Sequence, residues 1–230
     1  MRERGRLPVI ADYARWGAGL VAGLPWTVRG SRGEFEFGGE RYPYVFCPYK
    51  WSWLTERTVE VPIAQAIVDA SAGKRILEVG NVLSHYGPQS HVIVDKYEET
   101  PGVLNLDVMD LEDLGQFDLI VAISTVEHVG WDEEPRDPDK APEAVRRLVA
   151  QLAPAGRLLL TVPIGYHPGL DAALRSGELT AARSSALRRY GRGPRWQEVP
   201  ADDVWGTPYD FLLYSARAVL IAEIEKPAGS

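Results

Sequence analysis

Five short apolar segments lie between residues 75 and 165, and the first three carry an acidic residue at or near their ends. They read Arg75-Ile-Leu-Glu-Val-Gly80, Val92-Ile-Val-Asp-Lys96, Val103-Leu-Asn-Leu-Asp107, Phe117-Asp-Leu-Ile-Val-Ala-Ile123 and Gly156-Arg-Leu-Leu-Leu-Thr-Val162. Continuous apolar runs without alternation are typical of parallel strands buried on both faces. The pattern therefore predicts a parallel sheet. It places Glu78, Asp95 and Asp107 at the carboxyl ends of three strands, where doubly wound sheets bind nucleotides.

Two further segments have the periodicity of amphipathic helices. From Glu56 to Ala72 the apolar residues fall near one helical face, with Pro62 in the first turn and Gly73 after the end. A single apolar stripe also runs from Pro142 to Leu152. Because the segments between the other strands also suit crossover helices, we expect a doubly wound α/β fold with a mostly parallel sheet. The apolar run from Ala218 to Glu225 predicts its last strand.

The two flanks of this pattern are less regular. Residues 1–57 are rich in Gly, Trp, Tyr and Arg and have little periodicity, so we expect an irregular aromatic cap or lid there. Within it, Phe35 to Phe37 predicts a short strand or hairpin arm. The main domain should span 58–230, with a helical insertion at about 166–195 and a strand from Arg195 to Val199.

Composition and charge narrow the class of protein. The chain has 230 residues, 45% of them apolar and 25% charged, which is ordinary for one globular domain with an elaboration. Its formal charge of -7 argues against a nucleic-acid partner. One basic stretch is interpreted as a solvated helix face or, alternatively, as a contact for an anionic substrate: Arg183, Arg188, Arg189, Arg192 and Arg195.

The single cysteine, Cys47, excludes an internal disulfide and a multi-cysteine zinc site. Neither a signal-peptide apolar region nor a membrane-spanning apolar run is evident in the sequence. We therefore expect a cytoplasmic protein without a membrane partner.

The order of these segments resembles that of the class I S-adenosylmethionine-dependent methyltransferases over about residues 59 to 165. Glu78-Val-Gly80 resembles the first motif of that family, and Ser124-Thr-Val-Glu-His-Val129 resembles the motif after its fourth strand. The resemblance implies a seven-stranded Rossmann-like sheet and S-adenosylmethionine as cofactor. In the family, the acid at the Asp95 position hydrogen-bonds both ribose hydroxyls, and the acid at the Asp107 position lies near the adenine amine. A carboxylate suits the first role because its two oxygens can accept two hydroxyl hydrogen bonds.

The loop after Gly80 departs from the family pattern, in which glycines recur at alternate positions. Val82 and Ser84 stand in those places. Because Val82 adopts a left-handed conformation only at a cost, we expect a different loop path that brings Ser84, His85 or Tyr86 near the cofactor. A loss of cofactor binding is the alternative. The expected cofactor contacts are Glu78, Gly80, Asn81, Ser84, Tyr86, Asp95, Lys96, Asp107, Val108, Ser124 and Glu127.

Three histidines are candidates for catalysis. Methyl transfer from a sulfonium is an in-line displacement, and a hydroxyl acceptor also needs a base for its proton. A histidine near its ordinary pKa suits that role, so we rank His128 first, then His167, then His85. His128 has an alternative role as a hydrogen-bonded support under the adenine or methionine. His91 opens a strand and is interpreted as structural.

Substrate contacts are expected outside the conventional core. Aromatic rings stack on sugars or aromatic ligands, and an arginine pairs with an anion. The candidates are Tyr49, Trp51, Trp53, Arg57 and Tyr166, with Trp196 or Tyr209 near the end of the chain. Trp51 and Trp53 would share one side of an extended segment. Buried packing explains most of these residues equally well.

The acid-rich stretch from Trp131 to Asp139 has two interpretations. Its carboxylates would suit Mg²⁺, whereas its two prolines favour a solvated loop. The second is preferred, so no metal is predicted.

The leading functional hypothesis is methylation of a small molecule, most readily O-methylation of a sugar or secondary metabolite in small-molecule biosynthesis. A non-catalytic, methyltransferase-like auxiliary or binding protein is the first alternative, since the glycine loop is degraded. A nicotinamide-dependent oxidoreductase is the second, disfavoured because the first turn lacks G-x-G-x-x-G. A homodimer is compatible with each of these hypotheses.

Overall fold

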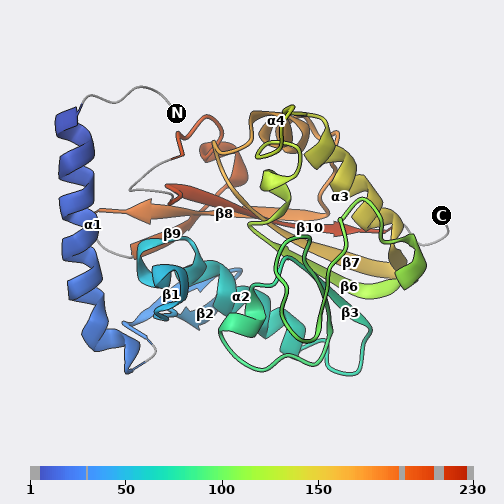
Figure 1. Cartoon of the computed structure of the whole chain (residues 1–230), viewed down its shortest axis with the longest axis horizontal. Coiled ribbons are helices and arrows are strands. Elements are labelled where there is room, and N and C mark those ends of the chain that lie inside the picture. Colours follow the sequence, from blue (N-terminus) through green and yellow to red (C-terminus); the bar gives the residue numbers. More distant parts are fainter. Residues whose placement is uncertain (1–5, 30, 192–194, 210–214, 227–230) are drawn as a thin grey trace.

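An eight-stranded sheet forms the centre of the computed structural model, which describes residues 6–29, 31–191, 195–209 and 215–226 (Figure 1). The strand order is β5-β4-β3-β6-β7-β10-β8-β9. Five strands run parallel: β5 (Val103–Leu104), β4 (Val92–Val94), β3 (Ile76–Val79), β6 (Phe117–Ile123) and β7 (Leu152–Pro163). β10 (Ala218–Glu225) is antiparallel between β7 and β8 (Arg183–Tyr190). The expected Rossmann-like α/β fold is confirmed.

The strand count differs from the expected seven. β9 (Arg195–Val199) pairs antiparallel with β8 and adds an eighth strand at the edge of the sheet. The predicted strand at this position is confirmed, but its pairing depends on β8, a strand that the sequence pattern does not predict.

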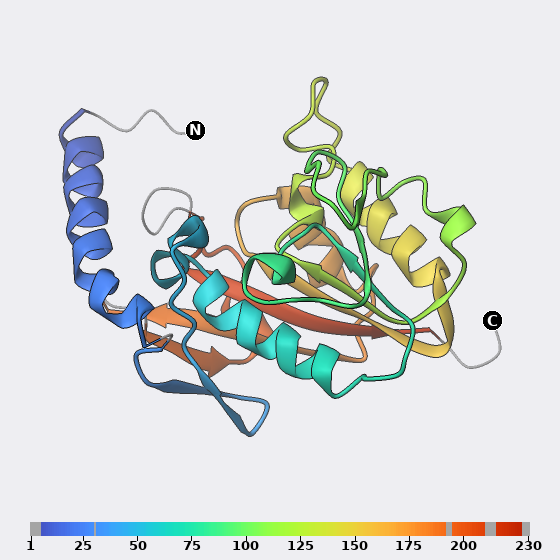
Figure 2. The same ribbon diagram turned by 60° about the horizontal axis from the view of Figure 1, so that its bottom comes forward.

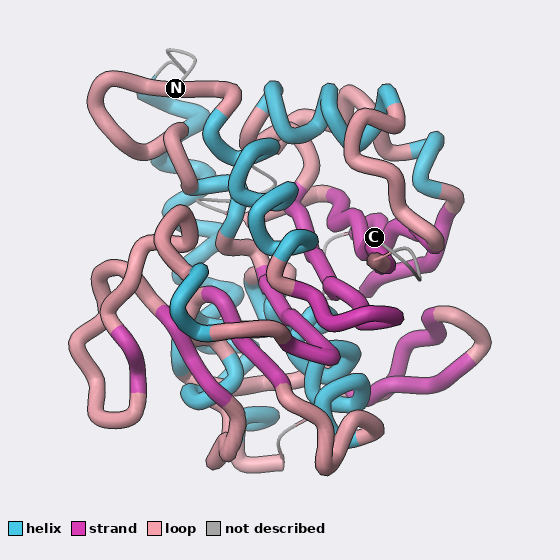
Figure 3. Tube along the Cα trace, turned by 90° about the vertical axis from the view of Figure 1, so that its right-hand side faces the viewer, coloured by secondary structure: helices cyan, strands magenta, loops and turns pink. Residues whose placement is uncertain are grey.

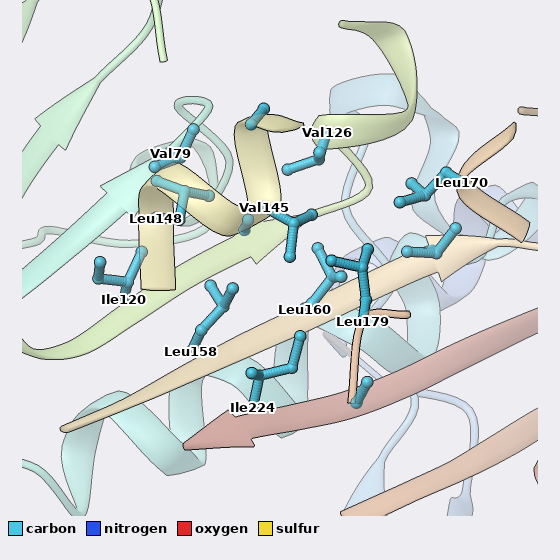
Figure 4. Close-up of a cluster of buried hydrophobic side chains, with 14 of the residues drawn as sticks. Val79, Ile120, Val126, Val145, Leu148, Leu158, Leu160, Leu170, Leu179 and Ile224 are labelled. Carbon is cyan, nitrogen blue, oxygen red and sulfur yellow. The ribbon is translucent and has the colours of Figure 1, made fainter. Parts of the chain in front are cut away.

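Helices cover both faces of the sheet. α2 (Arg57–Asp69) lies on one face, while α3 (Lys140–Ala150) and α4 (Pro168–Ser176) lie on the other (Figures 1 and 2). Figure 4 shows Val145 and Leu148 of α3 above Ile120 and Leu158 of the sheet. Since both faces are covered, the central strands read as continuous apolar runs, and residues 119–123 are fully buried.

Most of the expected crossover helices are absent from the described parallel connections. The β3–β4 link holds a 3₁₀ turn at Leu83–His85, the β5–β6 link holds another at Glu112–Leu114, and α3 alone is an α-helix. Figure 3 shows how much of the chain beside the strands is loop. The link 80–91 is too short for both a helix of several turns and the two bends that it needs. The loops of these connections therefore build much of the sheet edge at which the parallel strands end.

The expectation of an irregular N-terminal segment was wrong in part. α1 (Arg6–Thr27) stands at one edge of the molecule, and β1 (Glu34–Phe37) and β2 (Glu40–Pro43) form the predicted hairpin (Figure 2). A 3₁₀ segment follows at Tyr49–Leu54. Glycine disfavours helix, but in α1 it permits close packing: a Cβ on Gly23 would lie 2.1 Å from Trp53 Nε1.

The helical insertion expected at about 166–195 was also only half right. α4 ends at Ser176. The chain then forms β8, which pairs antiparallel with β10 and places Ala186 opposite Leu220. The arginines at 183, 188 and 189 therefore lie on a strand and not on a helix face, and Arg195 begins β9. Arg192 lies outside the described residues. None of the described helices is long and apolar enough to cross a membrane.

Candidate functional site

A cleft of about 480 Å³ opens beyond the carboxyl ends of β3, β4 and β6. Such an edge of a doubly wound sheet is where ligands bind. Residues of four loops converge there, because the parallel strands all end on this side. Seven of the expected cofactor contacts line the cleft: Gly80, Asn81, Asp95, Lys96, Asp107, Val108 and Ser124.

Gly80 fits its position for two reasons. Its φ is +83°, and a Cβ there would lie 2.3 Å from Thr125 Oγ1. Val82 is not left-handed, since its φ is −102° and its ψ is −56°. The loop thus takes a different path from that of a glycine-rich loop, as expected, and closes into the short 3₁₀ turn.

Glu78 holds this loop from beneath. Its Oε1 accepts hydrogen bonds from the backbone N–H groups of Val82 (2.8 Å) and Leu83 (2.7 Å), and its Oε2 lies 2.8 Å from His91 Nε2. Its side chain is fully buried and does not line the cleft. The expected cofactor contact is replaced by a positioning role, and His91 is structural as expected.

Asp95 lines the cleft, but its two oxygens differ. Oδ1 accepts the backbone N–H groups of Tyr97 and Glu98, both at 2.8 Å, whereas Oδ2 accepts, from the described residues, only that of Asn81 at 3.2 Å. A carboxylate oxygen has about two lone-pair sites. We expected both oxygens to accept hydrogen bonds from a ribose. This expectation is revised, because Oδ1 already accepts two hydrogen bonds and Oδ2 is the oxygen that can accept another.

Asp107 is part of an ionic network along the rim. Its Oδ2 lies 2.9 Å from Lys96 Nζ, which also lies 3.1 Å from Glu133 Oε1. Burial acts to raise the pKa of Asp107, but hydrogen bonds from Lys96 and from the Met109 N–H give a net lowering. Asp107 is therefore ionised at neutral pH, and its Oδ1 accepts one hydrogen bond from the residues that the structure describes, that of the Met109 N–H.

Two residues of the acid-rich loop make contacts here: Glu133 belongs to this ionic network, and Asp132 binds His128. Glu133 also pairs with Lys140, and Asp132 pairs with His128 Nδ1 at 2.6 Å. The described residues contain no group of three or more His, Cys, Asp or Glu side chains arranged to hold a metal ion. Contacts to protein side chains explain the acids at 132 and 133.

A second cavity of about 750 Å³ adjoins the first. Aromatic side chains line much of it: Trp16, Tyr49, Trp51, Tyr166 and Tyr209. The two cavities share the residues that stand between them, namely Tyr49, Lys50, Arg57, Val82, Ser124 and His128. Ligands in the two cavities would therefore meet at these residues.

Arg57 is fixed by hydrogen bonds at this junction. Its guanidinium donates to the carbonyl oxygens of Ile123 (2.7 Å) and Ser124 (3.2 Å) and pairs with Glu60 Oε2 at 3.2 Å. Glu60 is completely buried and also accepts the hydroxyls of Ser124 and Thr161. These bonds tie α2 to the ends of β6 and β7, so Arg57 acts first as a support for the cavity wall.

His128 is the one of the three candidate histidines that lines these two cavities. Its ring is half exposed, stands edge-on to Tyr166 at 4.9 Å, and is oriented by Asp132. His167 is completely buried, where its Nδ1 accepts the Leu170 N–H as the cap of α4, and burial lowers its pKa. His85 stacks on Tyr49 and pairs with Glu98 outside both linings. Neither His167 nor His85 therefore lines the two cavities.

Several other expected contacts lie elsewhere. Trp53 is buried and donates to the Gly19 carbonyl of α1 at 3.0 Å, and Trp51 alone of the pair lines a cavity, because the segment is coiled rather than extended. Trp196 packs under Arg189. Tyr86 faces a separate cavity, and Ser84 bonds to Asn81.

The residues that build the site and that the sequence pattern missed include Trp16, Lys50, Glu60, Glu98 and Glu133. Glu60 alone gave a signal that could have been used, since this acid stands between the apolar residues Val59 and Val61 of the predicted helix.

No protein-family model matches the chain, and no curated protein matches it. Among solved structures it is similar to N-methyltransferase NodS from Bradyrhizobium japonicum with S-adenosylhomocysteine, at 14% identity over 75% of this chain and 91% of that chain, with a TM-score of 0.42. It is also similar to 1,6-didemethyltoxoflavin-N1-methyltransferase from Burkholderia thailandensis, at 15% identity over 85% and 100%, with a TM-score of 0.45. A possible histamine N-methyltransferase from Thermotoga maritima matches at 15% over 77% and 94%, again at 0.45. The assignment of a Rossmann-like fold rests on the strand order and directions given above.

Proposed function

We propose that this protein transfers a methyl group from S-adenosylmethionine to a small molecule, at a hydroxyl of a sugar or secondary metabolite. The observation that carries the proposal is the pair of adjoining cavities. One is lined by strand-end carboxylates, the other by aromatic rings, and His128 stands where they meet. A two-substrate transfer needs such a junction, because proximity and alignment supply most of its rate enhancement.

The first cleft fits the adenosine part of the cofactor. Its volume is within the range of small-ligand sites. Asp95 Oδ2 has room for a ribose hydroxyl, and Asp107 Oδ1 has room for the adenine amine. When bound, S-adenosylmethionine supplies a methyl group on a positively charged sulfur. Each of these carboxylates binds a different end of the adenosine, so together they fix its direction along the cleft.

The second cavity holds the acceptor in this proposal. Its aromatic walls suit the apolar face of a sugar or an aromatic ring. His128 Nδ1 is held by Asp132, which leaves Nε2 to take the acceptor's hydroxyl proton. Tyr166 donates its hydroxyl to the same carboxylate at 2.7 Å and so fixes Asp132 in place.

The nicotinamide alternative conflicts with the loop after β3. A pyrophosphate binds free backbone N–H groups at a helix N-terminus in such folds. Here the N–H groups of Val82 and Leu83 bond to the Glu78 carboxylate, and no α-helix follows β3 in the described link. A second anion at that place would meet the charge of Glu78.

Calorimetry with S-adenosylhomocysteine separates methyl transfer from a non-catalytic role. We expect binding to one site per chain, and then transfer of labelled methyl from S-adenosylmethionine to members of a panel of sugars and phenols. Absence of binding at millimolar ligand would refute the proposal. Binding without transfer to any member of a broad panel would favour the auxiliary role.

A further inference from the structure

We propose that Glu127 binds a protonated amino group of the acceptor, so that the substrate of this site is an amine-bearing small molecule. This inference rests on the proposed function for its identification of the aromatic cavity as the acceptor site. The inference adds Glu127 as a residue that recognises the acceptor, and it gives the acceptor a positive charge. It holds whichever atom of the acceptor receives the methyl group.

Glu127 is unusual among the buried acids around the cavity. It lines the cavity, its side chain is 1% exposed, and its Oε2 has no hydrogen-bond partner among the described residues. A buried carboxylate oxygen without a donor costs free energy, which a ligand that donates to it would recover. Its other oxygen, Oε1, lies 3.7 Å from His128 Nε2, too far for a hydrogen bond.

The neighbouring acids have partners of their own. Glu60 pairs with Arg57 at 3.2 Å and accepts two hydroxyls. Glu56 Oε2 accepts the Ala216 N–H at 2.8 Å, and its charge favours the charged form of the buried Arg189. Asp132 is held by His128 and Tyr166.

Within the part of the chain that the structure describes, Glu127 therefore has no cation of its own, since His128, 3.7 Å away, pairs with Asp132. A hydrogen bond from its own backbone N–H and the charge of Arg57 favour the ionised carboxylate, whereas the charges of Glu60 and Glu56 oppose it. Burial is the main reason that the pKa of Glu127 is raised well above its ordinary value. An ammonium group beside Glu127 would offset both the burial and the repulsion, whereas an anionic acceptor would add to them.

The rest of the wall also favours a cation. Tyr49, Tyr166 and Tyr209 line the cavity with Trp16 and Trp51, and the faces of such rings attract ammonium groups. Two cations do face the cavity, Lys50 and Arg57. Arg57 is committed to Glu60 and to two carbonyl oxygens, and Lys50 is exposed beside the Tyr49 ring. The features that remain for a ligand are thus a buried acid and partly exposed aromatic rings.

A binding experiment with two fragments of nearly equal shape tests this inference without turnover. Benzylamine is a cation at pH 7.5 and benzyl alcohol is neutral, and both are titrated into the full-length protein by ligand-observed NMR. We expect benzylamine to bind about tenfold more tightly, the effect of one charged hydrogen bond. Glu127→Gln keeps the size of the side chain and removes its ability to ionise beside an ammonium group, so the two fragments should then bind alike. Glu36→Gln removes an equal charge from the β1–β2 hairpin, outside both cavities, and should keep the preference.

The outcomes are distinct from those for the cofactor. Equal affinity of the wild-type protein for both fragments, undetectable benzylamine binding, or a preference that survives Glu127→Gln each overturns the inference. The first two need no variant, so misfolding of Glu127→Gln leaves the test intact. A parallel titration with S-adenosylhomocysteine reports on the proposed function: its failure with retained amine preference would refute methyl transfer and leave the cation site standing.

Discussion

Asp95→Asn is the substitution that most sharply tests the cofactor cleft. An asparagine can keep its amide oxygen where Oδ1 now accepts the Tyr97 and Glu98 N–H groups at 2.8 Å. Its NH₂ group then replaces Oδ2, the oxygen proposed to accept a ribose hydroxyl, and faces the Asn81 N–H at 3.2 Å. A hydrogen bond to a charged group contributes about 1.5–3 kcal/mol, so the Kd for S-adenosylhomocysteine should rise roughly 10- to 150-fold. Loss of the Asn81 bond should lower the free energy of unfolding by only about 1 kcal/mol.

The measurement is calorimetric titration beside thermal unfolding, with Asp118→Asn as the matched control. Asp118 Oδ2 accepts the Arg75 N–H at 2.8 Å at the opposite end of the sheet, so that variant should lose similar stability and no affinity. An Asp95→Asn protein that binds S-adenosylhomocysteine within twofold of wild type would refute the assignment of the ribose to Oδ2. A loss of affinity shared by both variants would show a general loss of structure instead.

Three further predictions follow from the same geometry. Gly80→Ala forces a methyl group at φ +83° to within 2.3 Å of Thr125 Oγ1, so chemical denaturation should show a loss of about 2–4 kcal/mol, and an unchanged midpoint would contradict the packing argument. His128→Gln should lower the rate of methyl transfer about a hundredfold or more while the Kd for S-adenosylhomocysteine stays within a few-fold, and undiminished transfer would remove His128 as the base. Burial raises the pKa of Asp171 from 3.8 to about 6. Between these two pH values the Asp171 carboxyl ionises in the unfolded chain but stays protonated in the folded protein, so the free energy of unfolding falls as pH rises. Asp171→Asn keeps an oxygen for the Gly165 N–H and should flatten this pH dependence of the free energy of unfolding, so an equal slope in both proteins would refute it.

The central strands could be predicted because a strand that is buried on both faces consists of consecutive apolar residues. β6 and β10 match the apolar runs that predict them almost to the residue. α1 and β8 could not be predicted in this way. α1 carries glycines that lower helix propensity, and it packs on Trp53 from a distant segment. β8 contains Arg and Ser at positions whose strand conformation depends on pairing with β10, another distant segment.

The candidate site, too, could be predicted only where neighbouring residues in the sequence determine it, and not where distant segments meet. That Asp95 and Asp107 would line one cleft followed from their places after consecutive strands of a parallel sheet. Their partners did not, since Lys96 reaches Glu133 through folding of the loops between them. His167 was a candidate base, but in the structure it is completely buried and caps α4, and neither its burial nor its bond to the Leu170 N–H was predicted from the sequence.

The different role of Glu78 follows from its place inside its strand. Alternate residues of a strand point to opposite faces, and Leu77 and Val79 belong to the cluster under α3 whereas Ile76 belongs to the one under α2. Glu78 therefore points to the α2 side, within the covered layer, while Asp95 lies one residue beyond the end of its strand. A buried acid must find donors, and the nearest are the N–H groups of the loop that leaves the same strand. This bonding also accounts for the lack of glycine at residues 81–86. Because Glu78 holds the Val82 and Leu83 N–H groups, the loop turns there without residues in the left-handed conformation.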